Sequence, residues 1–133
     1  MTDEWKKRGI KEGKEYAILT AEISKAAFGI TPSQHKKLKY LDRPSENLRD
    51  HMTDLELLFT ALGEASTTEI AKTHDAYGMT QNVSAARAGG KIAGDARAAL
   101  EAKTGRKVVS ASNYKDLPEA EVRKQLQTEG EDQ

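Results

Sequence analysis

Residues 47–72 read NLRDHMTDLELLFTALGEASTTEIAK and form the longest regularly patterned stretch of the chain. Thr53 and Glu56 have the T-x-x-E spacing of a capping box, in which each side chain accepts a hydrogen bond from the other residue's backbone N–H. Asp54 adds negative charge in the first turn, where the helix dipole favours it. These signals predict a central helix over residues 53–72.

Apolar residues recur along this helix with the period of one helical face. That stripe consists of Leu55, Leu58, Phe59, Leu62 and Ala65, while Leu57 and Ala61 lie on its far side. A helix that is apolar on more than one side should be covered on more than one side. We expect the stripe to face the core. Leu57 and Ala61 then meet either the rest of the chain or a partner subunit, and we expect a homodimer with these two residues in its interface.

A second long helix is predicted over residues 80–103, and its residues are mostly small. Two adjacent glycines, Gly89 and Gly90, lie in its interior, where each costs about 1 kcal/mol relative to alanine. Close approach of another helix would offset that cost. The sequence therefore predicts that Gly90 and Gly94, four residues apart on one side, pack against a neighbouring helix.

Shorter helices are predicted around these two, each from its own start and stop signals. Residues 3–8 precede Gly9, residues 21–28 precede Gly29, and a T-P-S-Q capping box opens a helix over residues 31–41. Residues 15–19 fit either a strand or the lead into a helix. Pro118 opens a last helix before an acidic tail that we expect to be disordered.

These helix signals predict an all-α fold, a compact bundle of five or six helices with at most one short extended segment near residues 107–110. We expect one helical domain over residues 1–117, followed by the C-terminal helix and tail over 118–133. A length of 133 residues fits one domain.

The composition excludes several classes of protein. The 21 Lys and Arg residues balance the 21 Asp and Glu residues, so the formal net charge is +0 and the chain is not a strongly basic nucleic-acid binder. The chain has no cysteine, which removes disulfides, thiolate metal sites and cysteine nucleophiles and fits a cytoplasmic protein. No apolar run approaches the roughly 20 residues of a membrane span, and residues 1–11 do not resemble a signal peptide.

No catalytic motif stands out. The GGKIAG sequence at residues 89–94 does not match a phosphate-binding loop, and helical packing is its preferred interpretation. The histidines, His35, His51 and His74, lack metal-site spacing and are expected at the surface or its boundary. We therefore expect no enzymatic activity, no metal, no cofactor and no small-molecule substrate.

The densest basic stretch, residues 35–43 in and just after the helix of residues 31–41, is the one functional candidate from the residues alone. We take its contacts to nucleic acid or a partner to be made by Lys36, Lys37, Lys39, Tyr40, Arg43 and Arg49. Lysine and arginine neutralise phosphates, and Arg43 and Arg49 would flank the helix in loops. A solvated helix face is the alternative interpretation.

Three blocks, in order, resemble a known family. They are YAILTAEISKAAFGITPSQHKKLKYL, NLRDHMTDLELLFTALGEASTTEIA and ARAGGKIAGDARAALEAKTGRKVVSASNY, and they span residues 16–114. They look like the C-terminal half of the DNA damage-inducible protein D (DinD) family, whose N-terminal half is related to BRO-type phage antirepressors. That half has no counterpart here, so the chain looks like an isolated C-terminal domain or a shortened relative.

The resemblance implies non-enzymatic regulation of recombination in the bacterial DNA damage (SOS) response, through DNA or a RecA-type recombinase filament. It gives no catalytic residues to carry over. The alternative is a phage antirepressor-like or antitoxin-like module that binds a protein and makes no DNA contact.

Overall fold

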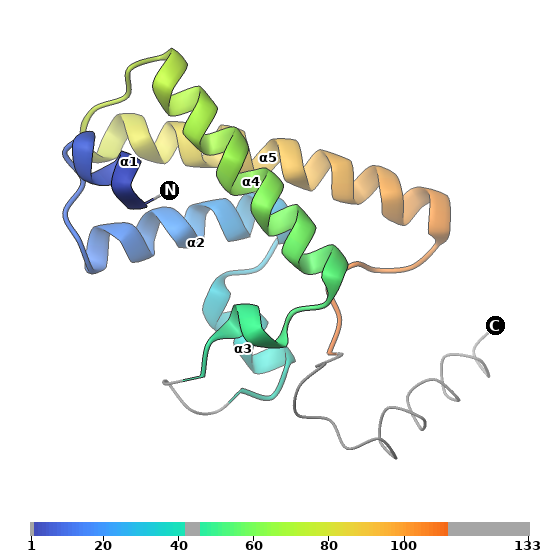
Figure 1. The fold of residues 1–133 in the computed structure, drawn as a ribbon. Coiled ribbons are helices and arrows are strands. Elements are labelled where there is room, and N and C mark those ends of the chain that lie inside the picture. The colour runs from blue at the N-terminus through green and yellow to red at the C-terminus, as the bar shows by residue number, and fades with distance from the viewer. Residues whose placement is uncertain (1, 42–45, 112–133) are drawn as a thin grey trace.

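The computed structural model describes residues 2–41 and 46–111, and this part of the chain is all-α, as predicted (Figure 1). Its helices are α1 (Thr2–Lys7), α2 (Lys14–Phe28), α3 (Pro32–Leu38), α4 (Asp54–Thr73) and α5 (Gly78–Thr104), with a 3₁₀ turn, η1 (Leu48–His51), before α4. Residues 15–19 belong to α2 and do not form a strand. The helix and tail predicted for residues 118–133, and the domain boundary at 117, lie outside the described residues.

The two longest helices, α4 and α5, form a hairpin, and α2 packs against α5 and also contacts α4 (Figure 1). The short α3 and η1 lie beside the first turns of α4, whereas α1 lies at the opposite end of the molecule. Helix α1 is held there by Trp5, which is buried against Ile10, Leu19 and Ile23. The Arg8 side chain also contacts Asp75 in the α4–α5 turn, at 3.1 Å.

The predicted helix boundaries are largely confirmed. Both capping boxes are present, at Thr31 before α3 and at Thr53 before α4, and Gly29 and Gly105 end α2 and α5 in the left-handed conformation. Helix α4 continues through Gly63 without a break. Helix α3 ends at Leu38, earlier than predicted, because Tyr40 has a φ of 61° and closes the helix.

The glycines of α5 explain how three helices approach so closely. A Cβ added to Gly89 would lie 2.6 Å from Thr67 Cα of α4, and one added to Gly90 would lie 2.7 Å from Ile23 O of α2. Gly94 faces the backbone of Ala26 in α2. The prediction that Gly90 and Gly94 pack against another helix is confirmed. Consecutive residues of a helix point about 100° apart, so Gly89 faces α4 while Gly90 faces α2.

The predicted orientation of α4 is wrong. Its buried residues are Glu56, Gly63, Thr67 and Ala71, and the leucine stripe lies on the outside. Leu58 is 64% exposed, Leu55 45% and Leu62 37%, and Ala65 is exposed too. Only Phe59 of the stripe is partly buried, against a cluster that contains Ala27, Phe28, Ala93 and Val108. The reason is steric: the α4–α5 contact is too close for leucine, so small residues fill it.

The extended segment allowed near residues 107–110 is not a strand, although part of it packs as expected. Val108 is buried beside Ala27 and Ala93. Its backbone N–H donates a hydrogen bond to Glu101 Oε2 at 2.9 Å. This bond holds the segment after α5 against the last turns of that helix.

Candidate functional site

The basic stretch of α3 does not form one continuous surface. Lys39 is fully buried, and its Nζ lies 2.7 Å from Glu56 Oε1 and donates to the Ser110 carbonyl at 2.9 Å. It cannot reach a phosphate, so the prediction that Lys39 contacts nucleic acid is wrong. The physical reason is the ion pair with Glu56, which compensates the charge of the Lys39 ammonium group inside the protein, while the aliphatic part of the side chain packs there.

His35 joins the same buried cluster, which corrects its predicted surface position. Its Nε2 lies 2.5 Å from Glu56 Oε2, and the Glu56 carboxylate also accepts the Thr53 N–H of the capping box at 2.9 Å. Burial raises the pKa of Glu56, but hydrogen bonds from His35, Lys39 and Thr53 outweigh it, so the net pKa is lowered. This cluster fixes α3 on the first turn of α4. His51 is also buried, whereas His74 is exposed.

The other predicted contact residues are dispersed. Lys37 is exposed, Lys36 is half-buried, and Arg43 lies outside the described residues. Arg49 forms an ion pair with Glu64 of α4. Tyr40 is 76% exposed and occupies the left-handed position that closes α3, where glycine is the usual residue. Lys36, Lys37 and Tyr40 therefore remain as a reduced basic surface.

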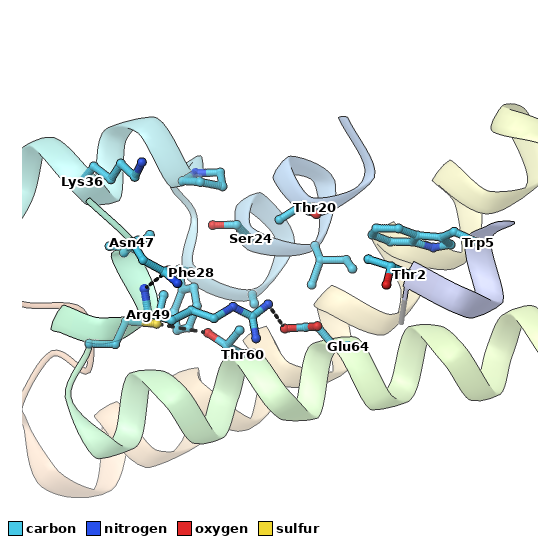
Figure 2. Close-up of a pocket in the computed structure, with 15 residues that line it drawn as sticks. Thr2, Trp5, Thr20, Ser24, Phe28, Lys36, Asn47, Arg49, Thr60 and Glu64 are labelled. Carbon is cyan, nitrogen blue, oxygen red and sulfur yellow. Dashed lines mark hydrogen bonds and ion pairs between the residues drawn. The ribbon is translucent and has the colours of Figure 1, made fainter. Parts of the chain in front are cut away.

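A cavity of about 270 Å³ lies between α1, α2, α3, η1 and α4 (Figure 2). Trp5 lines one end and Lys36 the other, and the Arg49–Glu64 ion pair spans the middle. The remaining wall is largely apolar, with Ile23, Phe28, Leu48 and Met52 among its residues. Sequence reasoning missed this cavity because its walls come from five separate elements.

Among the described residues, several exposed large hydrophobic side chains gather on one face of α4, which we call the apolar face. It consists of Leu55, Leu57, Leu58, Ala61, Leu62 and Ala65, all exposed. No residue of this set is charged. The two carboxylates in the same span lie elsewhere, since Glu56 is buried and Glu64 is paired with Arg49. Leu57 and Ala61, the predicted dimer residues, thus share one surface with the stripe that was predicted to be core.

The described ranges contain neither a metal-ligand cluster nor a membrane-spanning helix. Residues 2–41 and 46–111 contain no group of three or more His, Cys, Asp or Glu side chains placed to hold a metal ion. None of the helices in those ranges has the length and apolar character needed to cross a membrane.

The fold and these surfaces define a class: a small helical domain that exposes an apolar helix face and a reduced basic surface. Comparison of the chain with protein-family models, curated proteins and solved structures gives no match.

Proposed function

We propose that this chain is a non-enzymatic interaction module, and that the apolar face of α4 is its recognition surface. One observation carries the proposal: leucines point outward on α4, while glycine, threonine and alanine make its contacts with α5. Leu58, the most exposed of these leucines at 64%, therefore contributes little to the packing of the described fold. A contiguous apolar patch on a protein surface is typical of a binding site for another protein.

The regulatory role follows the resemblance described above. We place the module in the cytoplasm, in control of recombination during the DNA damage response, with a RecA-type recombinase filament as the partner to test first. A protein-binding phage antirepressor-like or antitoxin-like role is the alternative, and it uses the same apolar face without DNA.

A second candidate contact is the reduced basic surface of Lys36, Lys37 and Tyr40. The observation that favours it is Tyr40, an exposed aromatic ring held in a backbone conformation that costs a non-glycine residue about 1–2 kcal/mol. Exposed aromatic rings stack on nucleic-acid bases, and neighbouring lysines neutralise phosphates. The contact would be insensitive to sequence and would weaken steeply as salt rises.

One assay tests both contacts: co-sedimentation of the chain with a recombinase filament on single-stranded DNA, and with DNA alone, at two salt concentrations. Leu58→Glu should weaken filament binding by about tenfold or more, because it places a charge in the apolar face. The control is Ile18→Glu, which makes the same change at an exposed apolar position of α2.

A variant with Lys36 and Lys37 both changed to Glu reports on the basic surface in the same assay. Loss of DNA binding with this variant supports the second candidate, and unchanged binding identifies the lysines as solvated surface. If the parent chain binds neither filament nor DNA, the assignment to recombination control is wrong. Binding that Leu58→Glu leaves intact would remove the apolar face from the proposal.

A further inference from the structure

We propose that the apolar face of α4 pairs with the same face of a second copy of this chain, with the two α4 helices antiparallel across a two-fold axis. The inference rests on the proposed function for the claim that this face binds protein. It names a second copy of this chain as an occupant that would compete with the filament for this face, and it gives the register of the pairing.

The spacing of the exposed residues carries the inference. Leu55, Leu58, Leu62 and Ala65 are separated by three, four and three positions, which is the a and d spacing of two heptads. This spacing reads the same in both directions along the helix. A two-fold axis at the level of residue 60 therefore places Leu58 opposite Leu62 of the second copy, and Leu55 opposite its Ala65. Such a self-complementary surface is what a two-fold interface requires.

Charged residues fix that register. Moving one helix by a heptad in one direction places Glu69 of one copy opposite Leu58 of the other, and Lys72 opposite Leu55. Both Glu69 and Lys72 are exposed, and burying an unpaired charge against leucine is costly. Moving the helix the other way leaves Leu62 opposite the η1 turn at His51. Only the register centred on residue 60 pairs every apolar residue of the seam with another.

The area involved sets the expected strength. The exposed side chains of the apolar face form a patch of roughly a few hundred Å², below the about 800 Å² per partner that a standard stable interface buries. The dimer should therefore be weak, with association in the micromolar range, and would respond to local concentration.

Sedimentation velocity of the full chain, from low to high micromolar concentration, tests the proposal. The parent should shift from monomer to dimer, and Ile18→Glu should match it. Leu58→Glu and Leu62→Lys should each raise the dimer dissociation constant about tenfold or more. When these two variants are mixed, the introduced carboxylate of one copy faces the introduced ammonium group of the other, so dimers should reappear. Circular dichroism checks that each variant is folded.

The controls separate the orientations and the two proposals. A mixture of Leu58→Glu with Leu58→Lys should not restore dimers, and restoration there would establish parallel pairing and overturn the register. A parent chain that stays monomeric at high micromolar concentration overturns the inference. If Leu58→Glu nevertheless loses filament binding, the proposed function stands and only the pairing of two copies is wrong. A dimer that neither leucine variant weakens places the interface elsewhere.

Discussion

Replacing Glu56 with alanine should lower the free energy of unfolding by about 3–5 kcal/mol, because it leaves Lys39 and His35 buried without their carboxylate. The substitution also removes half of the capping box at the start of α4. Urea denaturation near pH 7 measures the loss. The control is Glu64→Ala, which breaks a partly exposed ion pair of the same helix and should cost no more than about 1 kcal/mol. Equal losses for the two variants would show that the buried cluster does not hold α3 on α4.

The same residue gives a pH dependence of known sign. The pKa of Glu56 is lower in the folded protein than the ordinary value of 4.5. Its stabilising contribution is therefore complete above that pH and is lost as the pH falls through the folded pKa. Glu22 and Glu101 also have lowered pKa values, so the parent alone reports several groups. The difference in unfolding free energy between the parent and Glu56→Gln isolates Glu56, and it should shrink in acid. A difference independent of pH would contradict this account.

Changing Gly89 to alanine should be the other large effect, a loss of about 3 kcal/mol at the upper end of the usual range for overpacking. The added methyl would lie within 2.6 Å of Thr67 Cα, so the α4 backbone itself must move. The gain in helix propensity, about 1 kcal/mol, offsets only part of this cost.

Gly63→Ala in α4 is the matched control for Gly89→Ala. The nearest atom to its added methyl is the side-chain Cγ2 of Ile23, at 3.1 Å, which can shift by the small amount required. It should therefore change the unfolding free energy little, or raise it. Thermal unfolding of the two variants compares them directly. Equal tolerance of both substitutions would mean that α4 and α5 are not in close contact at Gly89.

The local structure of this chain could be predicted because it depends on signals between near neighbours. A capping box needs only two side chains three positions apart, and both boxes were found where the sequence placed them. The C-terminal glycines and the close-packing glycines of α5 were predictable for the same reason. In each case the residue type alone predicts the local structure: a capping side chain predicts a helix start, and a glycine predicts a helix end or a close helix contact.

The burial of α4 could not be predicted in the same way. The periodic spacing of apolar residues identifies an apolar helix face. It does not show whether that face packs in the core or is exposed to solvent. The true contact face, with Gly63 and Thr67, has no strong apolar signal. The buried position of Lys39 is hidden for a similar reason, since its partner Glu56 is 17 residues away and resembles an ordinary capping residue.

The central claim is that the leucines of α4 face outward and serve binding, not folding. Urea denaturation of Leu58→Glu, at a concentration low enough for monomers, tests it most directly. The positive control is Leu19→Ala, which empties a fully buried site and should cost about 2–5 kcal/mol. We predict that Leu58→Glu stays within about 0.5 kcal/mol of the parent, as surface substitutions do. A loss comparable to that of Leu19→Ala would contradict the claim.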